Sequence, residues 1–311
     1  MAHSRRFRFG IQLSSAPNGE DWAALARKAE GLGYSTLFLP DHFGDQLAPL
    51  PAMMAAADAT SDLRVGALVF DNDYKHPVVL AKELATVDVL SGGRVEVGLG
   101  AGWMKSDYDQ SGIPMEAPGV RVSRMEEAIT VIKGCFASGP FSYDGEHYQI
   151  TGYDSRPKPL QSPPPFLIGG GAKRVLSIAA REAQIVGINP SIHSGQVDAA
   201  AAQNGAAAET DKKLAWVREA AGPRYDDLEI NLLMFAGIVT DDRKGTAEMM
   251  APLFGLPPEE LDTYPHACIG TIEEIADDLR ARRERWDASY IVFQGDTMET
   301  MAPVVAALRD T

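Results

Sequence analysis

The sequence predicts an α/β protein folded as a (β/α)8 TIM barrel with insertions, in one domain that spans residues 1–311. Short runs rich in Val, Ile, Leu and Phe alternate with helical patterns from near one end of the chain to the other. Eight such runs can be counted, and no stretch between them has the composition of a domain linker. This alternation favours a closed barrel over an open dinucleotide-binding sheet.

The expected strands are short and rich in Val, Ile, Leu and Phe, as strands buried on both faces are. They are residues 6–13, 35–40, 63–70, 94–99, 165–168, 185–188, 228–239 and 289–293. Helical periodicity lies between them, and Thr271 with Glu274 has the spacing of a capping box. Two insertions interrupt the alternation: a hairpin over 141–151, and an Ala/Gly/Gln-rich excursion over 193–210 that we expect to be mobile.

Composition limits the classes of function. Acidic residues outnumber basic ones by 43 to 29, and the formal net charge of −14 disfavours nucleic-acid binding. Cys135 and Cys268 are the two cysteines, and neither lies in a CxxC pair, which is typical of a reducing compartment. No apolar run reaches transmembrane length. We therefore expect a cytoplasmic protein, not bound to a membrane, that acts on a small molecule.

Candidate active-site residues follow the expected strands, because a barrel builds its active site at the C-terminal ends of its strands. Asp41 and His42 follow the second strand in LPDHFGDQ, and Trp103 and Asp107 follow the fourth. An imidazole can donate or accept a proton near neutral pH. His42 could be a metal ligand, a proton donor or acceptor, or a polar loop residue. The chain has no HxH, HExxH or CxxC motif, which disfavours metal, and the strand-end position favours the proton role.

Two glycine runs also follow strands. Gly169, Gly170 and Gly171 precede a helix expected to begin near Ala172. Amide groups at a helix N-terminus suit a phosphate, especially with Lys173 or Arg174 nearby, although a tight turn explains three glycines equally well. The run GLGAG at 98–102 lacks dinucleotide-loop spacing, and we expect its glycines to let a planar ligand approach the backbone.

The segments that carry these residues resemble the bacterial luciferase-like superfamily of flavin- or deazaflavin-dependent (β/α)8 enzymes. The resemblance rests on GYSTLFLPDHF at 33–43, RVGALVFDNDYKHPVVLAKELATVDVLSGGRVEVGLGAGW at 64–103, GEHYQI at 145–150 and PPFLIGGG at 164–171. It covers nearly the whole chain, and the sequence looks most like the branch that uses the deazaflavin coenzyme F420.

The resemblance implies roles for particular residues. His42 would face the deazaflavin ring and handle the substrate proton while hydride moves to or from C5. A non-prolyl cis peptide would lie beneath the ring at Leu68-Val69 or one residue earlier. Asn189 to Ser191 would close over a phosphate at the triple glycine. The full set of residues expected to contact the cofactor is Asp41, Leu68, Val69, Asn72, Gly100, Ala101, Gly102, Gly169, Gly170, Gly171, Lys173, Asn189 and Ser191.

One position departs from the resemblance. Trp103 stands where several relatives carry a glutamate proton donor, so the acid is unassigned and Trp103 is expected to form an apolar wall of the substrate pocket. The leading hypothesis is an F420-dependent oxidoreductase that forms a homodimer and uses no metal. The alternatives are an FMN-dependent two-component monooxygenase, a non-catalytic deazaflavin-binding protein and a metal-dependent barrel hydrolase.

Overall fold

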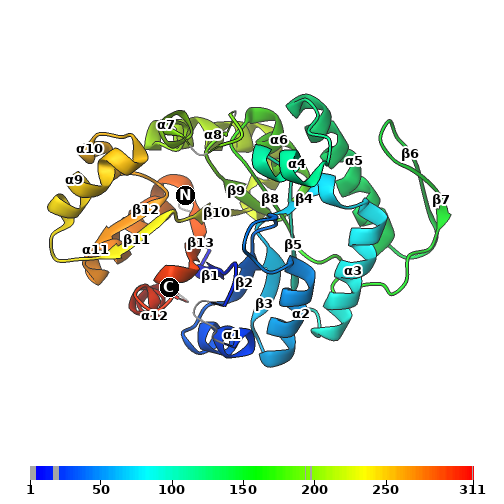
Figure 1. Cartoon of the computed structure of the whole chain (residues 1–311), viewed down its shortest axis with the longest axis horizontal. Coiled ribbons are helices and arrows are strands. Elements are labelled where there is room, and N and C mark those ends of the chain that lie inside the picture. Colours follow the sequence, from blue (N-terminus) through cyan, green and yellow to red (C-terminus); the bar gives the residue numbers. More distant parts are fainter. Residues whose placement is uncertain (1–4, 17–20, 193, 197, 310) are drawn as a thin grey trace.

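The computed structural model describes residues 5–16, 21–192, 194–196, 198–309 and 311. Eight parallel strands close into a barrel, which confirms the predicted fold class (Figure 1). Closure follows from two pairings, of the first strand with the last and of the third with the fourth barrel strand. The barrel strands are β1 (Arg8–Gln12), β2 (Thr36–Leu39), β3 (Arg64–Ala67), β5 (Val95–Gly100), β8 (Phe166–Gly170), β9 (Ile185–Ile188), β10 (Glu229–Leu233) and β13 (Ala288–Gln294).

Helices surround the barrel (Figure 1). Thr271 and Glu274 form the predicted capping box at the start of α11. No helix within the described ranges is long and apolar enough to cross a membrane. The α-helices are α1 (Trp22–Gly31), α2 (Pro49–Ala59), α3 (Pro77–Leu90), α4 (Lys105–Ser111), α5 (Pro118–Phe136), α6 (Lys173–Glu182), α7 (Ala199–Asn204), α8 (Ala207–Ala221), α9 (Arg243–Phe254), α10 (Pro258–Leu261), α11 (Ile272–Trp286) and α12 (Ala302–Leu308), and the 3-10 turns are η2 (Asn72–Tyr74), η3 (Gly222–Asp227) and η4 (Gly295–Thr297).

Two expected strands are divided in the structure. The run 63–70 forms β3 and then β4 (Phe70–Asp71), separated at Leu68-Val69. The prediction of one strand over 228–239 is wrong, because β10 ends in the barrel and β11 (Ala236–Val239) pairs outside it with β12 (Ala267–Gly270), which was not predicted. The backbone changes partner at this point: the Met234 amide donates to Val292, and the next amide donates to His266. Continuous apolar composition does not reveal such a change of partner.

The two insertions differ in outcome. The predicted hairpin is confirmed as β6 (Phe141–Asp144) and β7 (Gln149–Tyr153), which project outward on the side of α5 (Figure 1). The described part of the excursion expected over 193–210 contains α7 and the start of α8, which the sequence did not predict, and its mobility stays a prediction. Asp198 caps α7 by accepting from the Ala201 amide, and the alanines that follow favour helix. His193, in this stretch, lies outside the described residues.

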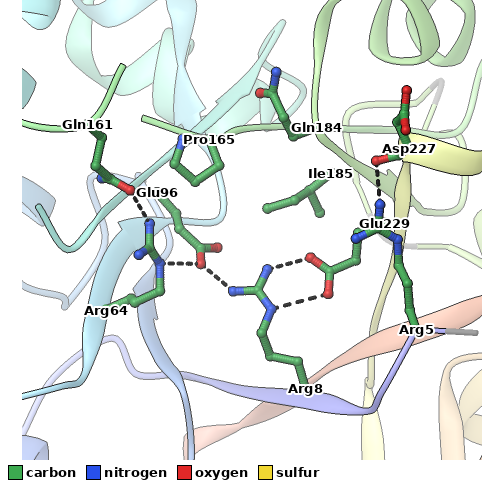
Figure 2. A pocket seen from close by; sticks show the side chains of 10 residues that line it. All are labelled: Arg5, Arg8, Arg64, Glu96, Gln161, Pro165, Gln184, Ile185, Asp227 and Glu229. Atoms are coloured by element: carbon green, nitrogen blue, oxygen red, sulfur yellow. Dashed lines mark hydrogen bonds and ion pairs between the residues drawn. The ribbon is translucent and has the colours of Figure 1, made fainter. Parts of the chain in front are cut away.

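An ionic cluster closes the N-terminal end of the barrel, beside a cavity of about 410 Å³ (Figure 2). Glu96 is fully buried there and accepts hydrogen bonds from Arg8, from Arg64 at 2.8 Å and from the Tyr290 hydroxyl at 3.1 Å. Burial alone would raise the pKa of Glu96, but the two guanidinium groups hold it below its usual value. Since barrels carry their chemistry at the opposite end, we interpret this cluster as structural.

Candidate active site

His42 and Asp107 meet at the C-terminal end of the barrel, although 65 positions separate them in the sequence. The buried strand β2 ends at Leu39 and delivers His42 to the mouth, and Asp107 lies in the first turn of α4, after β5. His42 Nδ1 is 2.7 Å from Asp107 Oδ2. Asp107 also accepts from the Tyr74 hydroxyl at 3.1 Å and from the Phe43 amide at 3.4 Å. The carboxylate therefore fixes the imidazole through Nδ1 and leaves Nε2 for exchange with a ligand.

Trp103 borders the imidazole of His42. The two ring centroids are 5.5 Å apart and the planes meet at 87°, so the rings pack edge to face. The loop after β5 thus supplies an aromatic wall and, four residues later, the carboxylate Asp107. The sequence placed Asp107 on this loop without a role. Its position in the first turn of a short helix was the available signal, but the pairing with His42 depends on the tertiary fold.

A second group of acids lies behind this pair. Asp41 accepts from the Asp71 amide at 3.1 Å, and the Tyr108 hydroxyl is 2.9 Å from a carboxylate oxygen of both Asp71 and Asp73. Arg124 donates to Asp73 at 3.0 Å. Burial raises the pKa of Asp41 and of Asp71 to about 6. These two carboxyl groups therefore change protonation near pH 6.

The backbone at Ala101 and Gly102 is held by protein groups. Gly102 has φ of +73°, and a Cβ there would lie 1.9 Å from the Tyr108 hydroxyl oxygen and 2.5 Å from Asp71 Oδ2. Arg121 donates to the carbonyl oxygens of Ala101 at 3.1 Å and of Gly102 at 2.5 Å. The glycine at 102 therefore makes room for Tyr108, and the approach of a planar ligand to this backbone stays a prediction.

The cis peptide implied by the resemblance is present between Leu68 and Val69. The Leu68 carbonyl oxygen accepts from the side-chain amide of Gln12 at 2.7 Å. A Cβ at Gly100 would lie 2.6 Å from Val69 Cγ2, so this glycine lets Val69 pack against β5. Gly100, like Gly102, therefore allows close packing within the protein, and its contact with a cofactor stays a prediction.

Asn72 lies in the wall of a cavity beside the acidic group. Its side chain is 2% exposed, and Nδ2 is 3.4 Å from the hydroxyl of Tyr148, which comes from the hairpin insertion. The cavity has a volume of about 300 Å³. It is lined by Asn72, Asp73, Lys75, His76, Ile113, Pro114, Glu116, Arg124 and Tyr148. Asn72 thus supports the hairpin at the edge of the barrel mouth.

The triple glycine is divided between a strand and a turn. Gly169 and Gly170 belong to β8, so Gly171 alone of the three lies in the turn before α6. A Cβ at Gly171 would lie 2.4 Å from the Ser191 nitrogen and 2.5 Å from the Asn189 carbonyl oxygen. The loop after β9 therefore lies directly against Gly171. The phosphate that the resemblance implies at the triple glycine stays a prediction. Asn189 Oδ1 is buried and has no hydrogen-bond partner among the described residues.

The start of α6 lies beside this turn. Its N-cap residue, Ala172, offers no side-chain hydrogen bond, so ligands or water must satisfy the first amides of the helix. The ammonium group of Lys173 is 3.3 Å from Glu219, and Arg174 donates to the Ser123 hydroxyl at 2.9 Å. Both cations are therefore engaged on the outer, exposed side of the helix.

The donor and acceptor set fits a flavin or a deazaflavin. The pyrimidinedione edge of either ring presents N–H groups, and the unpartnered side-chain oxygen of Asn189 can accept a hydrogen bond from such a group. The first amides of α6 suit the phosphate that either cofactor carries. Within the described ranges, no group of three or more His, Cys, Asp or Glu side chains is arranged to hold a metal ion.

Comparison with known proteins places this geometry in a family. The FMNH2-dependent dimethylsulfone monooxygenase of Pseudomonas putida is 37% identical over 116 residues, which are 37% of this chain and only 32% of that enzyme. The coenzyme F420-dependent tetrahydromethanopterin reductase of Methanopyrus kandleri superposes with a TM-score of 0.77 at 17% identity, over 98% of this chain and 100% of that one. An F420-dependent secondary alcohol dehydrogenase superposes with a TM-score of 0.78 at 16% identity, with the same coverage. At such identities the structures show a shared fold. The family model described as luciferase-like monooxygenase matches residues 3–304, and the chain belongs to that family.

Proposed function

We propose that the protein is an F420-dependent oxidoreductase in which His42 donates or accepts the substrate proton. The observation that carries the proton role of His42 is the contact between His42 Nδ1 and the buried carboxylate of Asp107 at the barrel mouth. When bound, the reduced deazaflavin supplies hydride from C5 to an activated carbon of a small organic substrate. The protein supplies the proton, the orientation of the reactants and the exclusion of water.

Asp107 gives His42 a defined role in this chemistry. With Nδ1–H donated to the carboxylate, Nε2 is the nitrogen that exchanges a proton with the substrate. The negative charge also stabilises the imidazolium that forms when His42 accepts a proton. Trp103 covers one side of the imidazole and limits access of water to it. General acid-base catalysis of this kind contributes about 10²- to 10⁴-fold to the rate.

Cofactor titration tests the proposal. The purified protein would be titrated with F420 and with FMN, using quenching of tryptophan fluorescence, and we expect tight binding of F420. Turnover of reduced F420 would then be measured with a panel of carbonyl compounds and conjugated alkenes. His42→Ala should lose turnover and retain cofactor affinity. Binding without turnover by the wild type would indicate a non-catalytic deazaflavin-binding protein.

The second candidate is an FMN-dependent monooxygenase that receives reduced flavin from a separate reductase. It is favoured by the sequence match to a relative named as an FMNH2-dependent dimethylsulfone monooxygenase. The His42–Asp107 pair serves either reaction, since both need a positioned proton donor or acceptor. Micromolar affinity for FMN without affinity for F420, together with oxygen-dependent product formation, would replace the first proposal with this one.

We also propose a homodimer. Helix α3 exposes apolar side chains at Val79, Val89 and Leu90, with exposures of 50%, 37% and 64%. A helix with such side chains on its outer face is typical of one that packs against another surface. Light scattering should give a mass near twice 33.5 kDa, and Leu90→Glu should shift it toward the monomer. A monomeric wild type would refute the proposal.

A further inference from the structure

Asp107 orients the imidazole of His42, yet it lies on a helix of only 7 residues. The N-cap residue of α4, Met104, makes no side-chain hydrogen bond, so no cap fixes the start of the helix. A helix of this length is also marginal by itself. The position of Asp107 relative to His42 therefore depends on the contacts that α4 makes with the rest of the protein.

Tyr108, the next residue on α4, makes such a contact at the barrel mouth. Its side chain is 2% exposed, and its hydroxyl oxygen is 2.9 Å from a carboxylate oxygen of Asp71 and 2.9 Å from one of Asp73. Arg124 donates to Asp73 at 3.0 Å and fixes that carboxylate from α5. Burial and the two carboxylates raise the pKa of the Tyr108 hydroxyl, so it keeps its hydrogen and acts as a donor at neutral pH.

The contact of Tyr108 with Asp71 closes a ring that begins and ends at His42. The Asp71 amide donates to the Asp41 carboxylate at 3.1 Å, and Asp41 directly precedes His42 after β2. The ring runs from His42 through Asp107, Tyr108, Asp71 and Asp41 back to His42. In such a ring no member can move without breaking a hydrogen bond or distorting the backbone, so the ring holds its members more rigidly than one contact does.

The loop that leads into α4 is shaped around the same hydroxyl group. A Cβ on Gly102 would lie 1.9 Å from the hydroxyl oxygen of Tyr108, so the backbone passes as close to that oxygen as a glycine allows. Arg121 holds this backbone from α5 through the carbonyl oxygens of Ala101 and Gly102. The path of the chain from β5 to α4, which also carries Trp103, is therefore fitted to the position of the Tyr108 hydroxyl.

We propose that Tyr108 and Asp71 are positioning residues, whose contact holds α4 so that the Asp107 carboxylate orients His42. Their effect on the rate rests on the proposed function, in which His42 exchanges the substrate proton. Their effect on the imidazole does not, because it involves only groups of the protein. If Tyr108 served packing alone, its loss would lower stability and leave the orientation of His42 unchanged.

Nuclear magnetic resonance of protein labelled with 15N-histidine tests the orientation without any cofactor. The quantity measured is the rate at which the Nδ1 hydrogen of His42 exchanges with water, and its signal is identified by its loss in His42→Ala. Tyr108→Phe removes the hydroxyl and keeps the ring, and the exchange should become about tenfold faster because the contact with Asp107 opens more often. The buried His266, which donates through Nδ1 to the Leu233 carbonyl oxygen at 2.9 Å, is the internal reference and should not change.

Three further variants separate positioning from packing. Asp71→Asn keeps one accepting oxygen and offers an N–H group to the Tyr108 oxygen, so exchange at His42 should stay within about threefold of the wild type. Asp71→Ala removes both groups and should resemble Tyr108→Phe. Tyr225→Phe is the matched control, because it removes a hydroxyl 2.6 Å from the Asp287 carboxylate in η3, which precedes β10 at the opposite end of the barrel. Exchange at His42 should be unchanged in this control.

Kinetics test the same proposal through the rate. With reduced F420 and an acceptor, Tyr108→Phe should lower kcat by about tenfold and leave the dissociation constant of F420 within about threefold. In the Asp107→Asn background the same change should lower kcat by less than about twofold, because its effect passes through Asp107. Equal reductions in the two backgrounds would show that Tyr108 acts independently of Asp107 and would refute the proposal.

The exchange rates decide the proposal even if the proposed function fails. Unchanged exchange at His42 in Tyr108→Phe would overturn it, and so would equal acceleration at His42 and His266, which would indicate general loosening of the fold. If Tyr108→Phe does not fold, equal exchange at His42 in Asp71→Asn and Asp71→Ala would count against it. A wild type that turns over no acceptor with F420 or FMN would remove the proposed function and leave the role of Tyr108 to these measurements.

Discussion

Replacing Glu96 by Gln tests whether the ionic cluster at the N-terminal end of the barrel stabilises the fold. The change keeps the side-chain volume and removes one negative charge. Glu96 is fully buried and accepts hydrogen bonds from Arg8, Arg64, Tyr290 and Thr36. A glutamine can replace one accepting oxygen, but its amide group would face donors.

The expected loss of unfolding free energy depends on the partners that Arg8 and Arg64 keep in the variant. Arg8 keeps Glu229, which it contacts through Nε at 3.2 Å and through a terminal nitrogen at 2.6 Å, and Arg64 keeps Gln161 at 2.9 Å. Both arginine side chains are 25% exposed, so water can reach them. Breaking a buried ion pair costs about 3–5 kcal/mol, and this residual pairing and hydration favour the lower end, about 3 kcal/mol.

Urea denaturation followed by circular dichroism at pH 7 measures this loss. Glu229→Gln is the control, because that carboxylate is 14% exposed and, among the described residues, forms an ion pair with Arg8 alone, so a loss of about 1 kcal/mol is expected. The pKa of Glu96 is lowered by folding, so its stabilisation is present above the unfolded-state pKa and is lost as pH falls below it. The difference between wild type and Glu96→Gln should therefore shrink at pH 3. A loss no larger than that of Glu229→Gln at pH 7 would refute the reasoning.

Three further changes probe the barrel mouth. Asp107→Asn removes the charge that orients the imidazole of His42. Steady-state kinetics should show a kcat lower by about 10- to 100-fold, and titration should show a cofactor affinity within about threefold of the wild type. An unchanged kcat would contradict the pairing of Asp107 with His42. Asp41→Asn removes a carboxyl group whose folded pKa is raised to about 6, so its ionisation destabilises the folded protein above that pH. In urea denaturation the variant should be more stable than the wild type by about 1–2 kcal/mol at pH 8 and equally stable at pH 3.5. A difference in unfolding free energy that does not change with pH would contradict the raised pKa. Gly102→Ala should lower the free energy of unfolding by more than about 3 kcal/mol, because the added Cβ would clash with Tyr108. Gly112→Ala is the control, since Gly112 has φ of +76° with open space around it, and a loss of about 1 kcal/mol is expected. Equal melting temperatures for the two variants would disprove the clash.

Local patterns in the sequence were sufficient for most of the fold. Each barrel strand is a short apolar run between helical patterns, because both faces of a parallel strand are buried. The capping box at Thr271 and the hairpin over 141–151 depend on residues near one another in the chain, so the sequence predicted both. The division of 228–239 was not predicted, since both β10 and β11 have strand-like composition and the partner with which each one pairs is not encoded locally.

The candidate site, like the fold, could be predicted only in part from the sequence. Placing His42 at the barrel mouth required only the end of β2 and the rule that barrels act at the C-terminal ends of their strands. The partner of His42 is Asp107, and the partner of Asp71 is the Tyr108 hydroxyl. Such contacts join residues that are far apart in the sequence, and no helical or strand periodicity marks them. The sequence determined which strand ends carry chemistry, and only the tertiary structure, through strand order and helix packing, decided which side chains meet there.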